Sequence, residues 1–249
     1  MLELTLDTHV DMARSGARHG AGLFETIRVK DGRAKHLEAH LARLARGAEF
    51  LGLGAPPPAA EVQDFLETRK VNEGLQCGVL RMVAVDRWLM IKADTWQASR
   101  PERIVIDTSQ KTTRCRSNPL NRFKTLSYLE NLLLAKEAQE RSLFEVVARN
   151  EAGHLTDGGR TNLFLVMDGV ILTPPVEDGA LPGIARQLLL EAGLVQEASL
   201  TLGELEDAGA VFLTNALQGV VPVHEVDGWR AKNPKHPLLR AAEEWLLSI

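Results

Sequence analysis

A lysine and a tyrosine stand four residues apart in the stretch NRFKTLSYLENLLLAKEAQE, and Tyr128 is the only tyrosine in the chain. A lysine kept out of water and near other cations has a lowered pKa, so it can form a Schiff base or act as a base. The apolar spacing predicts a helix from about residue 127 to 142, which would place Tyr128 one turn beyond Lys124. A cation near a helix N-terminus is electrostatically disfavoured, so this position for Lys124 favours a functional reason over a plain surface lysine.

Three other stretches contain glycines and small polar residues of the kind that let the backbone contact a ligand. LTDGGRTNLF (residues 155–164) places an acid and two glycines before an expected strand, which lets a turn approach a ligand closely. LPGIAR (181–186) offers the unpaired N–H groups of a helix start, which suit a phosphate. TNALQGVVPV (214–223) places small polar residues at a strand end. Each stretch alone is also compatible with an ordinary turn or helix start.

Composition excludes several other classes of protein. The chain has 249 residues and a net charge of -4, so it lacks the basic surface typical of nucleic-acid binding. Its seven histidines and two cysteines show no ligand spacing, and we expect no metal. No apolar run reaches the roughly 20 residues that a membrane span needs, and the N-terminus has no signal-peptide pattern. We therefore expect a cytoplasmic protein that binds neither membrane nor nucleic acid.

Helical and strand patterns alternate along the whole chain, which predicts a mixed α/β (α+β) fold. Asp31-Gly32 is a strong hairpin signal between two strands, and leucines spaced three and four apart predict a helix that ends at Gly52. Apolar periodicity disappears over SQKTTRCRSNPLN. We therefore predict a small N-terminal domain over 1–108, a linker over 109–121 and a larger C-terminal domain over 122–249.

Taken in order, six segments resemble the fold type IV pyridoxal-phosphate enzymes, the class IV aminotransferase family. The segments run over nearly the whole chain, and they are GLFETIRVKDG, HLARL, KTLSYLENLLLAKEA, LTDGGRTNLFLV, LPGIAR and TNALQGVVPV. The resemblance implies a two-domain α/β fold with pyridoxal 5'-phosphate bound between the domains, in a homodimer. It also implies an enzyme, since the Schiff-base lysine is present, and disfavours a non-catalytic binding protein.

The resemblance assigns a role to each candidate residue. Lys124 matches the lysine that forms the Schiff base, and Tyr128 matches the phenol beside the cofactor's phenolic oxygen. Asp157 stands where the family usually has a glutamate that pairs with the pyridine nitrogen. The phosphate-binding positions are matched by Arg43, by the backbone of Gly183, Ile184 and Ala185, and by Asn215 and Ala216.

Within this family, the segment from Asn215 to Val223 resembles that of the 4-amino-4-deoxychorismate lyases. The implied reaction removes pyruvate from 4-amino-4-deoxychorismate and leaves 4-aminobenzoate, a folate precursor. Substrate carboxylates would then need cations, for which Arg28, Arg81 and Arg87 are candidates, although each is equally compatible with a charge at a strand edge. An aminotransferase acting on branched-chain or D-amino acids remains the alternative.

Overall fold

The computed structural model of the chain describes residues 1–7, 9, 15–68 and 76–249. The chain forms two compact units. The first contains Met1–Ala98 together with Phe123–Tyr128, and the second contains Ser99–Arg122 together with Leu129–Ile249. The predicted two-part division therefore has a different boundary, because the chain leaves the first unit after Ala98 and returns to it for six residues.

The predicted linker begins inside a strand of the second unit. β6 (Val105–Arg114) pairs in parallel with β7 (Glu145–Asn150), with an irregularity between Thr108 and Thr113. Ser109 is buried there and donates a hydrogen bond of 2.7 Å to Glu137. Ser109 and Arg114 of this strand are buried and have polar partners inside the protein, so residues 109–114 lack apolar periodicity without being a linker.

A five-stranded sheet forms the first unit, in the order β1-β5-β4-β2-β3. Its strands are β1 (Glu3–Thr5), β2 (Gly22–Lys30), β3 (Arg33–Ala34), β4 (Cys77–Val85) and β5 (Trp88–Thr95). Asp31 and Gly32 connect β2 to β3 with φ of 52° and 72°. Positive φ at both central residues is the requirement of the tight hairpin turn, so this prediction is confirmed.

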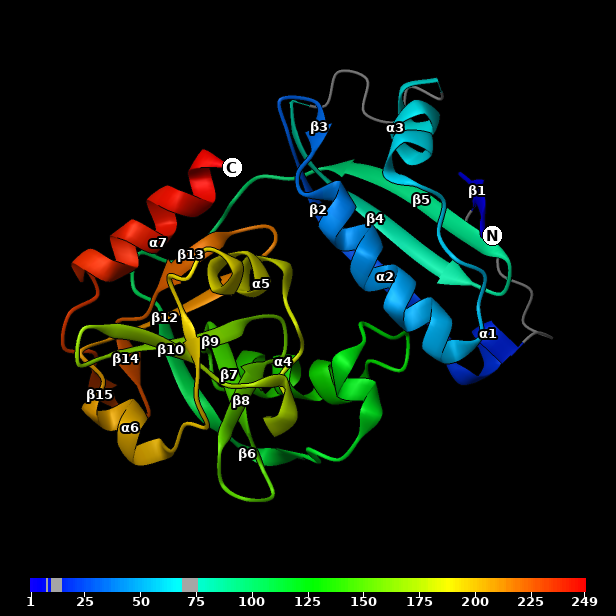
Figure 1. The fold of residues 1–249 in the computed structure, drawn as a ribbon. Coiled ribbons are helices and arrows are strands. Elements are labelled where there is room, and N and C mark those ends of the chain that lie inside the picture. The colour runs from blue at the N-terminus through cyan, green and yellow to red at the C-terminus, as the bar shows by residue number, and fades with distance from the viewer. Residues whose placement is uncertain (8, 10–14, 69–75) are drawn as a thin grey trace. The chain divides into compact units, whose positions relative to one another are not determined.

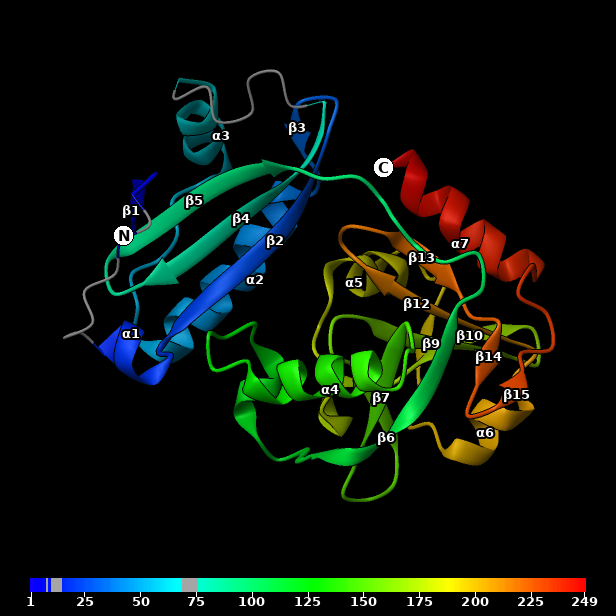
Figure 2. The same ribbon diagram turned by 180° about the vertical axis from the view of Figure 1, so that it is seen from behind.

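Helices of the first unit are α1 (Ser15–His19), α2 (Leu37–Leu51) and α3 (Ala59–Thr68). Figures 1 and 2, seen from opposite sides, show α2 along one face of the five-stranded sheet. Its predicted apolar side chains are buried against β2, β4 and β5, and Gly52 ends the helix in the left-handed conformation with φ of 67°. The predicted helix and its end are therefore confirmed.

The second unit contains a ten-stranded sheet with helices on it. Along the path β11-β10-β9-β8-β7-β6-β14-β15 the strands are bonded in turn, and β12 pairs with β9 and β13. The remaining strands are β8 (Leu155–Gly158), β9 (Asn162–Met167), β10 (Val170–Thr173), β11 (Gln196–Glu197), β12 (Ala210–Asn215), β13 (Gly219–Pro222), β14 (Glu225–Val226) and β15 (Trp229–Arg230). The helices are η1 (Pro119–Arg122), α4 (Leu129–Glu140), η2 (Val176–Asp178), α5 (Ile184–Glu191), α6 (Leu202–Asp207) and α7 (Pro237–Ser248).

Alternating side chains of β9 build two different cores. Leu163 and Leu165 pack with residues of β6, β7, β12 and β13. Phe164 and Val166 point to the opposite face, where they pack with α5 and α7. Since successive side chains of a strand face opposite sides of the sheet, β9 contributes side chains to both hydrophobic cores. The ends of β8, β9 and β12 are thereby held on a rigid base.

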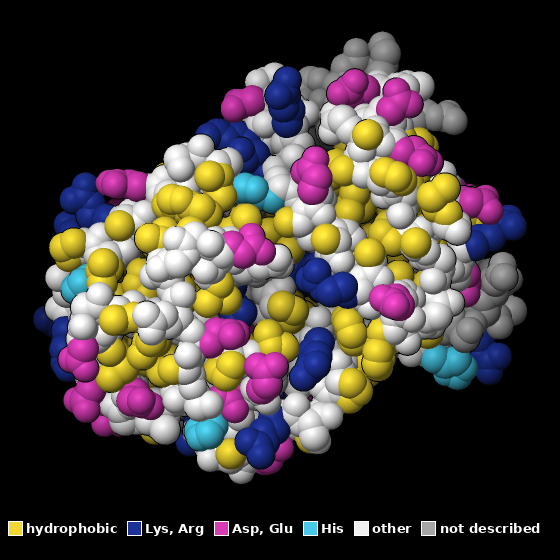
Figure 3. Space-filling view, viewed as in Figure 1, with side chains coloured by type: hydrophobic (Ala, Val, Ile, Leu, Met, Phe, Trp, Pro, Cys, Tyr) yellow, Lys and Arg dark blue, Asp and Glu magenta, His cyan; other side chains and the backbone are white. Residues whose placement is uncertain are grey.

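Charged side chains of both signs are interspersed on the face drawn in Figure 3. None of the helices in the described part of the chain is both long and apolar enough to cross a membrane.

A buried ion cluster joins β2 to α2. Glu25 accepts hydrogen bonds from Arg43 Nε at 2.8 Å and Nη2 at 2.6 Å, and it lies 2.7 Å from Nδ1 of His40. All three side chains are buried. Burial by itself raises the pKa of Glu25, but the charge of Arg43 and the hydrogen bonds of His40 and Arg43 outweigh it and lower the pKa to about 2.

This lowered pKa predicts acid sensitivity of the first unit. A carboxyl with a pKa near 4.5 when unfolded and about 2 when folded stabilises the fold above pH 4.5, by on the order of 3 kcal/mol. That contribution is lost as the pH falls from about 5 to about 2. Glu25→Gln should therefore lower the free energy of unfolding most at neutral pH, with the deficit shrinking over this window, as measured by urea denaturation at a series of pH values.

Glu38→Gln, which changes an exposed glutamate of α2, is the matched control and should alter the free energy of unfolding little at any pH. A deficit of Glu25→Gln that stays constant from pH 7 to pH 2 would contradict the assignment.

Candidate functional site

Lys124 lies on an extended segment beside β2, five residues before α4. Its carbonyl oxygen accepts a hydrogen bond of 2.9 Å from the N–H of Phe24, and the next residue, Thr125, forms a bridge with Leu23. α4 begins only at Leu129. The helix predicted from about residue 127 to 142 is therefore present as Leu129–Glu140, two residues shorter at each end, and backbone bonds to β2 hold the segment around Lys124 extended outside it.

Two aromatic rings surround the amine of Lys124. Its Nζ donates to Tyr128 Oη at 3.3 Å and lies 4.2 Å from the ring centre of Phe24 and 4.7 Å from that of Tyr128. The two rings meet edge to face at 5.0 Å. Ring faces attract a cation and exclude water from it. The structure thus brings Lys124 and Tyr128 together, as the sequence predicts, through a chain turn and not through helical spacing.

Phe24 and Arg28 share one face of the first unit's sheet. The alternation of β2 buries Leu23, Ile27 and Val29 in the core beside α2, so Phe24 and Arg28 point to the other face, where both are half-buried. This face also carries the rings around Lys124. Of the three candidate substrate arginines, Arg28 therefore lies on the strand that positions the amine.

The other two candidate arginines have partners at the surface. Arg81 of β4 donates to Asp94 at 2.5 Å and is about half exposed, at 51%. Thr26, which lies between Phe24 and Arg28 along β2, is directly opposite Arg81 in the β2–β4 pair, so Arg81 belongs to the same face. Arg87 follows β4 in the turn, with its guanidinium 4.5 Å from the ring centre of Trp88.

Arg43 is an interior residue. It is only 6% exposed, and Glu25 binds its Nε and Nη2 atoms, as described above. Arg43 is therefore not a charge on the surface of α2. The paired carboxylate fixes the plane of the guanidinium, which is the form of arginine that binds planar or tetrahedral oxyanions well.

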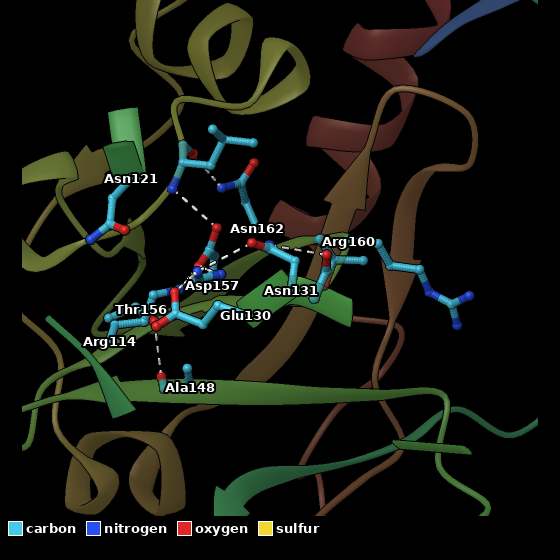
Figure 4. A network of polar contacts seen from close by, with 12 residues as sticks. Arg114, Asn121, Glu130, Asn131, Ala148, Thr156, Asp157, Arg160 and Asn162 are labelled. Carbon is cyan, nitrogen blue, oxygen red and sulfur yellow. Dashed lines mark hydrogen bonds and ion pairs between the residues drawn. The ribbon is translucent and has the colours of Figure 1, made fainter. Parts of the chain in front are cut away.

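Asp157 ends β8 inside the second unit. Its Oδ1 accepts from Arg114 Nη2 at 2.9 Å and Nε at 3.1 Å, and its Oδ2 accepts from the N–H of Leu181 at 3.0 Å. Figure 4 shows Asp157 with Arg114 beside it. Burial raises the pKa of Asp157, and the charge of Arg114 counteracts part of that rise. A carboxylate has about four lone-pair sites, so it retains acceptor capacity beyond these three bonds.

Arg114 connects Asp157 to α4. Its Nε and Nη2 atoms bind Asp157. Its Nη1 atom donates to Glu130 at 2.5 Å and to Asn131 Oδ1 at 3.3 Å. Asn131 in turn donates to the carbonyl oxygen of Gly159 at 3.1 Å. The buried cation therefore ties the acid of β8 to the helix and to the turn after β8 (Figure 4).

Asn162 fixes the backbone that leads into α5. Its Nδ2 donates to the carbonyl oxygen of Leu181 at 2.8 Å, so Asp157 and Asn162 together bind both backbone polar groups of Leu181. A Cβ atom at Gly183 would lie 1.9 Å from Asn162 Oδ1. This contact explains why glycine precedes the helix, since an alanine there has no room.

The N-terminus of α5 presents backbone N–H groups. The first helical bond runs from Gln187 to the carbonyl of Gly183 at 2.8 Å, and no side chain caps the helix at Gly183. The N–H groups of Ile184 and Ala185 therefore precede the first bond of the helix ladder. Such a helix start favours an anion.

Asn215 is the last residue of β12, and Ala216 follows it. Thr214 is the register partner of Asn162, which brings this strand end next to the end of β8 and the start of β9. The side chain of Asn215 accepts from the N–H groups of Leu217 at 3.0 Å and Gln218 at 2.8 Å. The side chain of Asn215 thus shapes its own turn.

Sequence reasoning missed several residues that hold this site, namely Phe24, Glu25, His40, Arg114, Asn131 and Asn162. Glu25 had a signal, because it occupies an inward position between Leu23 and Ile27 where β2 is otherwise apolar. Arg114 had none, since its partners are distant in sequence.

Comparison with known proteins identifies the family. The family description "Amino-transferase class IV" matches residues 22–226. A D-alanine aminotransferase of Bacillus licheniformis is 30% identical over 243 residues, covering 88% of this chain and 83% of the relative. A Methanocaldococcus jannaschii protein, provisionally described as a branched-chain-amino-acid aminotransferase, is also 30% identical, covering 89% of this chain and 84% of its own length.

A solved structure agrees over the full length. A Legionella pneumophila protein, provisionally described as a 4-amino-4-deoxychorismate lyase, has a TM-score of 0.85 at 27% identity and covers 99% of this chain and 98% of its own. The predicted mixed α/β fold of this family is therefore confirmed. The chain belongs to the class IV aminotransferase family and is a pyridoxal-phosphate-dependent enzyme.

Proposed function

We propose that the enzyme is a 4-amino-4-deoxychorismate lyase, which eliminates pyruvate to leave 4-aminobenzoate. The observation that carries the proposal is the end-to-end match to the Legionella pneumophila structure, in which almost nothing of either chain is left over. The proposal agrees with the resemblance of the stretch from Asn215 to Val223 to these lyases.

We further propose which residues hold the cofactor. Lys124 binds its carbonyl carbon and Tyr128 its phenolic oxygen, while Asp157 pairs with its pyridine nitrogen. The phosphate is bound by Arg43, by the backbone of Gly183, Ile184 and Ala185, and by Asn215 and Ala216. Three observations support these roles. Arg43 is a buried cation, and no side chain caps the start of α5. The buried carboxylate of Asp157 can accept a further hydrogen bond.

Pyridoxal phosphate, when bound, supplies an electron sink for the carbon atom attached to the substrate nitrogen. Once the substrate amine has replaced it at the cofactor, the freed amine of Lys124 would serve as the base that takes a proton from this carbon and as the acid that returns one to the leaving group. Tyr128 Oη, 3.3 Å from Nζ, orients the amine during both transfers. Asp157 keeps a proton on the pyridine nitrogen, because a neighbouring negative charge favours the protonated form.

Substrate recognition is assigned to the exposed face of the first sheet. The substrate carries carboxylates, and Arg28 and Arg81 lie on the face that carries Phe24. We therefore propose these two arginines for the carboxylates. Arg87, whose guanidinium lies over Trp88 in the turn, is the weaker candidate.

Aminotransfer is the second candidate function. The relatives from Bacillus licheniformis and Methanocaldococcus jannaschii bear aminotransferase names, one for D-alanine and one for branched-chain amino acids. The residues proposed above would serve this reaction as well. It differs because the cofactor keeps the amino group of the first substrate and passes it to a second, a 2-oxo acid.

Product analysis separates the two reactions. The enzyme loaded with pyridoxal phosphate should convert 4-amino-4-deoxychorismate into equal amounts of 4-aminobenzoate and pyruvate, with no 2-oxo acid added. Leucine or D-alanine with 2-oxoglutarate should give no glutamate above the rate of the protein-free mixture. Glutamate formation without 4-aminobenzoate would contradict the lyase assignment and establish the aminotransferase.

We propose that the enzyme is a homodimer. Leu129, Leu132 and Leu133 of α4 are exposed by 67%, 59% and 49%, and their spacing places them on one side of the helix. Adjacent exposed leucines are typical of surfaces that a partner covers. Light scattering should give twice the chain mass of 27.4 kDa, whereas a mass equal to one chain would contradict the proposal.

A further inference from the structure

Glu145 is a fully buried acid at the start of β7, and the residues proposed for chemistry do not include it. Its Oε1 accepts from the N–H groups of Val146 at 3.1 Å and Gly159 at 3.2 Å. Its Oε2 accepts from the N–H of Arg160 at 3.2 Å and the hydroxyl of Thr161 at 3.1 Å. A side chain that is 0% exposed and has four donors is a built anion position.

Three of these four donors belong to the turn between β8 and β9. The turn is closed by a hydrogen bond of 2.8 Å from Gly158 to Thr161. A Cβ atom at Gly158 would lie 2.6 Å from Glu145 Cδ, so the turn is wrapped closely around the carboxylate. The conformation of the turn therefore depends on a carboxyl group that β7 supplies.

The two residues that flank this turn are Asp157 and Asn162, which are register partners. They bind the N–H and the carbonyl oxygen of Leu181 at 3.0 Å and 2.8 Å. Leu181 is two residues before Gly183, the N-cap residue of α5. Glu145 is thus connected to the helix start only indirectly, through the turn and then through Leu181.

We propose that Glu145 is a positioning residue: by holding the turn of residues 158–161, it sets the place of Asp157 and of the Leu181–Gly183 backbone. The cofactor part of this inference rests on the proposed roles of Asp157 and the α5 start. In Glu145→Gln the side chain keeps its size, but its NH₂ group faces at least one backbone N–H and cannot accept from it. The turn then loses a partner, and the two flanking residues lose their fixed place.

The test compares Glu145→Gln with Glu137→Gln, a matched change in the same unit. Glu137 is 1% exposed and accepts from Ser109 Oγ at 2.7 Å, the N–H of Gln110 at 2.9 Å and Arg141 at 3.0 Å. Both variants lose an acceptor in the interior, so both should lower the melting temperature. Amide hydrogen exchange is measured by NMR, residue by residue, on the cofactor-free protein, and the dissociation constant of pyridoxal phosphate is measured by titration.

Glu145→Gln should speed exchange of the Leu181 amide by about tenfold, although Glu145 does not touch it, and weaken pyridoxal phosphate binding by a similar factor. Glu137→Gln should leave both unchanged. An unchanged Leu181 amide in Glu145→Gln, or equal acceleration in both variants, would overturn the proposal. If Leu181 responds to Glu145→Gln alone while pyridoxal phosphate affinity stays at the parent value, the positional inference holds and the proposed cofactor role of this backbone fails.

Discussion

The carboxylate of Asp157 must be paired because it lies in the interior, and the pairs it makes organise the second unit's site. One oxygen is bound to Arg114 and the other to the N–H of Leu181. An unpaired buried charge costs several kcal/mol, so this acid constrains both partners. Arg114 also binds Glu130 and Asn131 of α4, and Leu181 lies three residues before the start of α5, so both helices are positioned by this acid.

The first unit follows the same physical rule with different residues. Glu25 is placed in the core by the alternation of β2, and Arg43 and His40 of α2 provide its partners. The pair keeps a cation inside the unit with its plane fixed. In each unit a buried acid thus holds an arginine in place.

The sequence predicts the elements better than their junctions. The hairpin at Asp31-Gly32 and the end of α2 at Gly52 follow from local backbone chemistry, and both are confirmed. The helix of α4 is also as expected, but the helical spacing assumed between Lys124 and Tyr128 is wrong, because the backbone bonds that hold Lys124 extended come from β2, about a hundred positions away. The polar end of β6 was mistaken for a linker for the same reason, since its partners lie on α4. Arg114 and Glu145 escaped notice because long-range polar pairing has no local pattern.

The central claim is that Lys124 is the residue to which the cofactor is bonded. The purified enzyme, loaded with pyridoxal phosphate, is reduced with borohydride, digested and analysed by mass spectrometry. We predict one phosphopyridoxyl group per chain, on the peptide that contains Lys124. A label on another lysine, such as the exposed Lys136 of α4, in a protein that retains its activity until reduction, would contradict the account.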